Sequence, residues 1–144
     1  MKNSFITIIL FSIFAGACAN QSHSPEMSDL TNPLPPCPST PNCVRTAASF
    51  GEVDSMKVFE AIQHALQSMK AEEITVADST LDIHAVFRIP VFGWRDDVNV
   101  SIQQIDNVTV AFFRSASREG TWDIWANSIR VRKLIRRTNN FLLQ

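Results

Sequence analysis

The pattern of apolar and polar positions first predicts a helix and then a set of strands. From residue 54 or 55 to residue 70, apolar residues recur at steps of three and four, which is the spacing of one face of an amphipathic helix. These apolar positions are Phe59, Ile62, Leu66 and Met69. We therefore expect a helix whose apolar stripe faces the protein core.

Beyond this helix the apolar residues recur at every second position, as in a β-strand with one buried face. The alternation covers residues 81–89 and 98–102, and a further strand is predicted over 108–114. Residues 73–77 are a candidate for a fourth strand. Because Asp and Asn tolerate left-handed backbone, Ile105-Asp106-Asn107 is predicted to form a hairpin turn. The result is an antiparallel β-meander of three to four strands.

A second amphipathic pattern, over residues 123–142, predicts a closing helix. The sequence has 4 glycines, no internal repeat and no glycine-rich phosphate loop, which argues against nucleotide loops and repeat architectures. We therefore predict an α+β fold: an N-terminal amphipathic helix, an antiparallel β-meander of three to four strands, and a C-terminal amphipathic helix.

The first residues have the pattern of a bacterial secretory leader. Lys2 precedes an apolar run over 5–14, which is shorter than the roughly 20 residues of a spanning helix, and Ala15-Gly16-Ala17-Cys18 follows. We expect residues 1–17 to be removed and Cys18 to carry lipid, and Ala19 resembles the pattern of outer-membrane sorting. The alternative is ordinary cleavage that leaves a soluble periplasmic product. Either outcome places the protein in the cell envelope, on its periplasmic side.

The mature chain divides into a tether and one domain. Residues 18–36 are rich in Ser, Pro, Asn and Gln and are expected to form a disordered tether, whereas residues 37–144 are expected to form a single globular domain. With Cys18 lipidated, Cys37 and Cys43 remain as a pair in an oxidising compartment, so we predict a disulfide between them. Zinc is the alternative, but no His or further Cys lies nearby in sequence. We predict no metal and no cofactor.

The charge is unevenly distributed, although the formal net charge is only −1. From Arg114 onward the sequence has seven basic residues and only two acidic ones, Glu119 and Asp123. Four of the basic residues cluster on the polar side of the closing helix: Arg130, Lys133, Arg136 and Arg137. A solvated helix face is the favoured interpretation. The alternative is an anionic partner, which in the envelope would be lipid or polymer rather than nucleic acid.

Polar residues that could carry chemistry concentrate where the last strand ends. If the hairpin turns at Asp106-Asn107, Asp97 falls opposite Ala116 to within one residue of register, which brings the polar ends of the last two strands together. The start of the closing helix adds three residues, because spacings of four and three share one face. The candidate cluster is Asp96, Asp97, Arg114, Ser115, Ser117, Arg118, Asp123, Asn127 and Arg130.

Three interpretations of this cluster are open. In the favoured one, the aspartates pair with the arginines and lock helix to hairpin. In the second, arginines and hydroxyls bind a small anion. In the third, Asp97 or Ser117 serves a small hydrolase, but no histidine adjoins the serines in sequence, so we assign no catalytic residue. The aromatic residues Phe92, Trp94, Trp122 and Trp125 are expected to pack in the core rather than to line a groove.

Three segments of the chain resemble the largely bacterial family called domain of unknown function 1499. They are residues 37–44, residues 92–98, and residues 114–120 with Asp123, Asn127 and Arg130. Trp125 departs from the family's pattern, which usually has Gly there; Ser128 replaces a usual Arg, and Arg45-Thr46 replace two serines. A bulky Trp125 is expected to fill part of a cleft beside Asn127. The resemblance implies an envelope protein and no established activity.

Taken together, these patterns predict a monomeric, noncatalytic envelope lipoprotein that is held at the membrane by its lipid and binds a small anionic ligand or an envelope component. The alternative from another class is a small periplasmic hydrolase. A third hypothesis is an envelope scaffold whose basic last helix contacts a partner protein.

Overall fold

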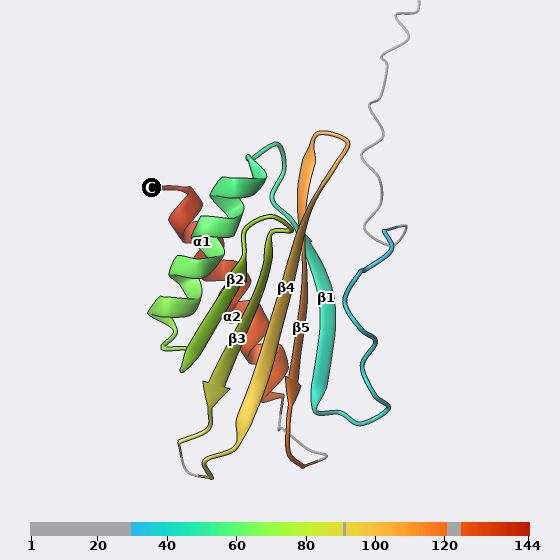
Figure 1. Ribbon diagram of the computed structural model, residues 1–144, viewed down its shortest axis with the longest axis vertical. Helices are drawn as coiled ribbons and strands as arrows, with labels where there is room; N and C mark the ends of the chain where they lie inside the picture. The colour runs from blue at the N-terminus through green and yellow to red at the C-terminus, as the bar shows by residue number, and fades with distance from the viewer. Residues whose placement is uncertain (1–29, 91, 121–124) are drawn as a thin grey trace, which may run out of the picture.

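The computed structural model describes residues 30–90, 92–120 and 125–144 (Figure 1). Within these ranges the chain forms five strands and two helices in an α+β arrangement, as predicted, with five strands rather than three to four. In chain order the elements are β1 (Cys43–Ser49), α1 (Ser55–Ser68), β2 (Glu73–Ala77), β3 (Asp82–Arg88), β4 (Arg95–Ile105), β5 (Val108–Ser117) and α2 (Ala126–Leu142).

The five strands form one antiparallel sheet in the order β1-β5-β4-β3-β2. Strands β2 to β5 are the predicted meander, including the candidate strand over residues 73–77. The sequence prediction missed β1, because its residues are small or polar and are mostly half-buried, so its apolar alternation is weak. It follows the disulfide turn and pairs with β5 along the whole of its length.

The predicted hairpin and its register are confirmed. Strand β4 ends at Ile105, Asp106 has a φ of 54°, and β5 begins at Val108. Asp97 pairs with Ala116. This register determines which side chains of β4 and β5 share a face of the sheet.

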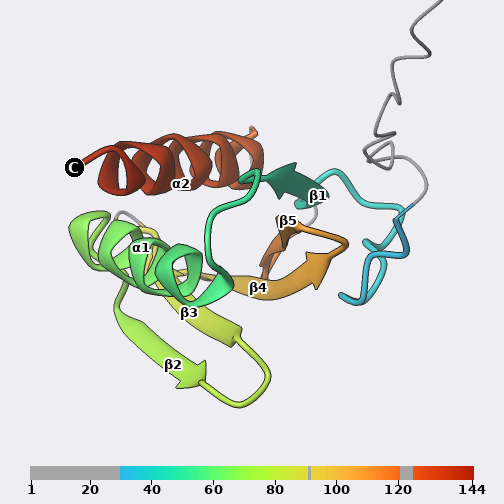
Figure 2. The same cartoon turned by 90° about the horizontal axis from the view of Figure 1, so that it is seen from above.

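Both helices cover the same face of the sheet, as the view from above shows (Figure 2). They pack on each other; α2 also contacts β5 and β1, and α1 contacts β4 and β2. The carboxylate of Asp54 caps α1 by accepting hydrogen bonds from the backbone N–H of Met56 and of Lys57. The predicted residues Phe59, Ile62 and Leu66 are buried against the sheet.

The face without helices, which we call the open face, meets the start of the described chain. Residues 30–42 form an N-terminal arm beside β1 (Figure 2). The guanidinium of Arg45 donates hydrogen bonds to the backbone carbonyls of Leu34 and Asn32, at 3.0 and 2.6 Å. The ordered contacts thus begin before Cys37, inside the segment expected to be a tether.

The predicted disulfide between Cys37 and Cys43 is confirmed, and it ties the arm to the first residue of β1. The predicted leader, Cys18 and residues 18–29 lie outside the described residues. Neither of the two described helices is long and apolar enough to span a membrane.

Candidate functional site

The alternation of side chains along β4 divides the predicted polar cluster between the two faces of the sheet. Successive residues of a strand point to opposite faces, so Asp96 lies on the helix side and Asp97 on the open face. Asp96 is 2% exposed, whereas the side chain of Asp97 is 25% exposed. The candidate residues therefore form two separate groups rather than one site.

The first group is a buried network between the sheet and α2. Arg130 donates a hydrogen bond from Nη2 to the carboxylate of Asp96, and from Nη1 to Asn127 Oδ1 at 2.8 Å and to Ser115 Oγ at 3.2 Å. The hydroxyl of Ser115 also donates to Asn127 Oδ1. The guanidinium of Arg130 lies 5.1 Å from the ring centre of Phe87, which covers it on the sheet side.

Asn127 connects this network to the chain segment before β1. Its Nδ2 donates to the backbone carbonyl of Asn42 at 2.9 Å and to Ser117 Oγ at 3.1 Å. Asn42 in turn donates from Nδ2 to the carbonyl of Gly120 at 2.7 Å. The network thus joins four parts of the fold, and none of its buried side-chain atoms lacks a hydrogen-bond partner within the described chain. Such full satisfaction is what a structural network requires.

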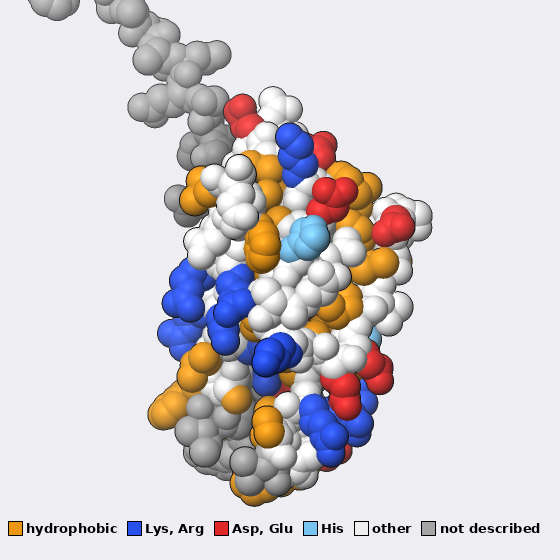
Figure 3. Space-filling view, turned by 90° about the vertical axis from the view of Figure 1, so that its left-hand side faces the viewer, with side chains coloured by type: hydrophobic (Ala, Val, Ile, Leu, Met, Phe, Trp, Pro, Cys, Tyr) orange, Lys and Arg blue, Asp and Glu red, His pale blue; other side chains and the backbone are white. Residues whose placement is uncertain are grey.

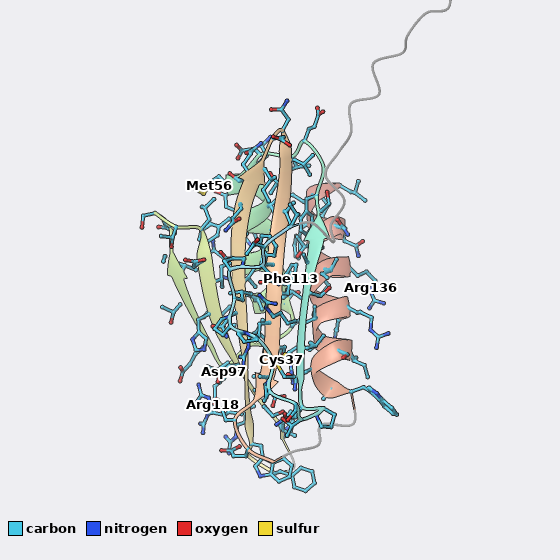
Figure 4. All side chains as sticks on the ribbon, turned by 90° about the vertical axis from the view of Figure 1, so that its right-hand side faces the viewer. Cys37, Met56, Asp97, Phe113, Arg118 and Arg136 are labelled. Atoms are coloured by element: carbon cyan, nitrogen blue, oxygen red, sulfur yellow. A yellow bond between two sulfur atoms is a disulfide. The ribbon has the colours of Figure 1, made fainter. Side chains whose placement is uncertain are left out.

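The second group lies on the open face and centres on Asp97. Arg118 holds this carboxylate with two hydrogen bonds, from Nε at 2.9 Å and from Nη2 at 2.8 Å, and Nε2 of His84 lies 2.8 Å from Oδ1 (Figure 4). Hydrogen bonding by Arg118, aided by His84, lowers the pKa of Asp97 from its ordinary value against the opposing effect of partial burial. Both carboxylate oxygens are occupied, so Asp97 is a weak base.

One register row crosses the open face and carries a polar or charged side chain from every strand. Residues paired across antiparallel strands share a face, and the row is Thr75, His84, Asn99, Arg114 and Arg45. Above this row, Ser101 pairs with Asp82. The strands therefore present hydroxyl, imidazole, amide and guanidinium groups side by side.

A hollow of about 380 Å³ lies over the β2 to β4 part of this row. The polar part of its lining consists of Thr75, His84, Asn99, Ser101 and Asp82. Two residues of the arm, Pro33 and Leu34, form a wall, and Arg45 fixes this wall through its hydrogen bonds to the arm's carbonyls. The hollow therefore depends on the arm as well as on the sheet.

Arg114 lies on the next strand from the hollow, directly opposite Asn99 and beside Arg45. Its Nε is buried and has no hydrogen-bond partner among the described residues. The ion pairs of the described chain involve other arginines, namely Arg95, Arg118 and Arg130. A buried donor without a partner is costly in a folded protein, and Arg114 Nε is the one buried side-chain donor or acceptor of the described residues that lacks a hydrogen-bond partner.

The family described as "Protein of unknown function (DUF1499)" matches residues 33–137, which include the arm wall, the whole sheet and most of α2. The chain belongs to the DUF1499 family. Curated proteins give no match to it. The matched span begins at Pro33, so the arm residues that wall the hollow are part of the DUF1499 domain.

Ser115 and Ser117, the serines of the predicted cluster in this DUF1499 domain, have no histidine beside them among the described residues. Ser115 and Ser117 face the helices and hydrogen-bond to Asn127, whereas His84 lies on the open face with Asp97. The sheet separates these two serines from His84, so His84 does not activate either of them. Asp123 of the predicted cluster lies outside the described residues, as does Trp122.

The aromatic residues are exposed, contrary to the expectation that they pack in the core. Phe92 is 61% exposed, Trp94 42% and Trp125 72%. Phe92 and Trp94 stack on each other with ring centres 4.7 Å apart, so they cover each other in place of a core. Trp125 has a φ of 61° at the start of α2, a conformation that suits the usual Gly of the DUF1499 pattern. Being exposed, its side chain does not fill a cleft beside the buried Asn127.

Sequence reasoning missed the open-face residues Thr75, His84, Asn99 and Ser101. Their signal was the polar half of the alternation in residues 73–102, which was interpreted only through its apolar half. Once the strand order is known, these polar positions fall into adjacent rows on one face. The sequence pattern left open whether residues 73–77 pair with β3, and this pairing is what places Thr75 beside His84.

Proposed function

We propose that this protein is a noncatalytic binding module of the cell envelope, which holds a small anionic ligand on the open face of its sheet. The observation that carries the proposal is a hollow of about 380 Å³, lined in part by polar side chains and next to a guanidinium with an unsatisfied buried donor. Concave sites with a few convergent polar groups are typical of small-molecule binding. The lipid-anchored location rests on the leader pattern ending at Cys18.

Arg114 favours an anion with further polar groups, whose charged end would lie beside Arg114 rather than beside the carboxylate of Asp82 in the lining. Arg114 offers a cation without an acidic partner in the described chain, and a guanidinium suits carboxylate or phosphate oxygens. Thr75, Asn99 and Ser101 offer uncharged donors and acceptors that fit hydroxyl groups. Asp97 is neutralised by Arg118, so it repels an anion less than a free carboxylate would. A hydroxylated carboxylate or phosphate is the ligand class that these groups fit.

The occupied state of Asp97 supports a binding role over hydrolysis. A general base needs a lone pair aimed at its substrate and a pKa near the working pH, whereas Arg118 holds the pKa of Asp97 below its ordinary value. Ser115 and Ser117 lie on the other side of the sheet from His84. Neither residue of the hydrolase hypothesis thus has the activation that catalysis requires.

Calorimetric titration of the full chain with citrate, glucuronate and inorganic phosphate tests the ligand class. We expect at least one of these anions to bind, and Arg114→Gln to weaken it at least tenfold, because the cation is lost. Arg132→Gln on α2 is the matched control, since it removes an equal charge from the other side of the sheet and should leave affinity unchanged. Absence of binding by all three anions, or equal weakening by both variants, would overturn the proposal.

Two further measurements test the other parts of the proposal. Turnover of a chromogenic ester or phosphate that disappears in Asp97→Asn or Ser117→Ala would contradict the noncatalytic assignment.

For the anchor, Cys18→Ala should move the protein from the membrane fraction to the soluble periplasmic fraction, together with loss of fatty-acid labelling. Unchanged fractionation of Cys18→Ala would remove the lipid anchor from the proposal.

A further inference from the structure

Four of the seven large apolar side chains that the described residues expose lie at one end of the molecule. The connection from β3 to β4 carries Phe92 and Trp94, and the cap and first turn of α2 carry Trp125 and Ile129. Both segments lie at the same end of the sheet, because the start of β4 pairs with the end of β5, from which the chain continues to α2. The exposed fractions are 61% for Phe92, 42% for Trp94, 72% for Trp125 and 56% for Ile129.

A basic stripe extends from this apolar end along the outer face of α2. The stripe consists of residues at steps of four, three and four, namely Trp125, Ile129, Arg132 and Arg136. Because of this spacing they lie on one side of the helix, and Lys133 lies beside them. All five are exposed. Figure 3 shows Lys and Arg side chains gathered over α2 at the left of that view, and the labelled Arg136 points away from the sheet in Figure 4.

The charge of this stripe is not compensated by the protein. Helix α2 contains five basic residues and no acidic residue. Arg130 pairs with buried Asp96 and Arg137 bonds to Ser68, but none of the ion pairs within the described residues involves Arg132, Lys133 or Arg136. Three neighbouring cations therefore attract anions from outside the molecule.

Trp125 combines a left-handed backbone conformation with an exposed side chain. Its φ of 61° lies in the left-handed region, which disfavours side chains, and its side chain is 72% exposed rather than packed in the core. A strained, exposed aromatic residue at the head of a basic stripe points to a role at the surface.

We propose that the outer face of α2, together with the stacked Phe92 and Trp94, is a contact surface for an anionic lipid bilayer. Trp side chains favour the water–bilayer interface, and Lys and Arg favour anionic headgroups, so the mixture on this surface matches the chemistry of that interface. The surface is distinct from the proposed ligand site, because the helices cover the opposite side of the sheet. Its function therefore does not depend on the small-anion proposal.

Co-sedimentation of the full chain with vesicles tests this surface. The vesicles are phosphatidylcholine with or without phosphatidylglycerol, and every variant carries the same leader, so differences between variants come from the substituted residues. We expect stronger binding to the anionic vesicles. Because one Lys or Arg near a charged bilayer contributes about fivefold in binding, Arg132→Glu with Arg136→Glu should weaken that binding by at least about 25-fold.

The matched control is Lys57→Glu with Lys70→Glu, which changes the net charge equally on exposed positions of and after α1. It should retain most of the binding. Phe92→Ser with Ile129→Ser keeps every charge and should weaken binding to anionic vesicles, since the apolar contact is lost. Urea unfolding of each variant establishes that it is folded.

Equal binding to neutral and anionic vesicles would overturn the proposal, and so would equal losses in the α1 and α2 charge variants. A third contrary result would come from cross-linking in intact cells. If the α2 charge variant still binds vesicles but no longer cross-links to an envelope protein that the wild type captures, the surface serves a protein partner.

Discussion

At the scale of single residues, the two consecutive aspartates of β4 show how position in a strand determines role. Asp96 is buried against α2 and pairs with Arg130, whose side chain is only 10% exposed. Asp97 pairs with Arg118, whose side chain is 43% exposed and therefore screened by water. Identical chemistry thus contributes to folding on one face of the sheet and remains accessible on the other.

We expect Asp96→Asn to lower the free energy of unfolding by about 3 kcal/mol, because it leaves the buried Arg130 without its countercharge. Asp97→Asn is the matched control, and its loss should stay below about 1 kcal/mol, as for other exposed ion pairs. Urea unfolding of the full chain with its disulfide intact measures both. Similar losses in the two variants would contradict the division of the cluster into a structural and an accessible group.

At the scale of elements, the two helices begin differently. Helix α1 has the side chain of Asp54 as its cap, whereas α2 begins at Trp125, which makes no side-chain cap hydrogen bond and has a positive φ. A left-handed residue costs an L-amino acid about 1–2 kcal/mol relative to glycine. The left-handed backbone of Trp125 at the start of α2 therefore lowers the stability of the protein. The proposed bilayer contact is a reason for Trp at this position.

Trp125→Gly should consequently raise the free energy of unfolding by about 1 kcal/mol, since glycine adopts this backbone conformation without strain. Ile129→Gly, inside the same helix, should lower it by about 1 kcal/mol, because glycine is unfavourable in a helix interior. Thermal and urea unfolding distinguish the two. If Trp125→Gly destabilises the protein, then contacts of the indole outweigh the backbone strain.

The same Trp125→Gly variant separates stability from surface function. It should bind anionic vesicles more weakly than the wild type while being more stable. Weaker binding accompanied by lower stability would attribute the loss to unfolding instead.

At the scale of the whole molecule, two exposed ion pairs make stability depend on pH. Hydrogen bonding by Arg95 lowers the pKa of Glu72, and hydrogen bonding by Arg118 lowers that of Asp97. A carboxyl whose pKa is lower in the folded state stabilises the protein above its unfolded value, about 3.9 for Asp, and this contribution is lost as the pH falls through the folded value. Both pairs therefore stabilise the protein at neutral pH and fail in acid.

We expect the stability difference between wild type and Asp97→Asn to be largest at neutral pH and to disappear in acid, below about pH 3.9. Arg118→Gln should reduce the same pH dependence, and the double variant should add little, because the two residues form one pair. Urea unfolding across this pH range measures the effect. A difference that grows as the pH falls has the wrong sign for a lowered pKa and would refute the assignment.

The sequence by itself determined much of this architecture through local rules. The three- and four-residue spacing of Phe59, Ile62 and Leu66 predicted α1, and the turn at Asp106-Asn107 predicted the pairing of Asp97 with Ala116 to within one residue. The remaining cysteine pair likewise predicted the disulfide. Each of these features depends on residues that are close in sequence or joined by one tight turn, so periodicity and turn chemistry suffice to specify them.

Only the tertiary structure decided which polar residues meet. Strand β1 pairs with β5, more than sixty residues later in the chain, and this long-range pairing places Arg45 beside Arg114. The arm then forms a wall of the hollow over β2 to β4, and the helices bury the face of β4 that carries Asp96 while the face that carries Asp97 stays open. No local pattern specifies these contacts, because they depend on strand order and on the choice of the covered face. The sequence thus determined the elements and the candidate chemistry, and packing divided that chemistry between a buried network and an open face.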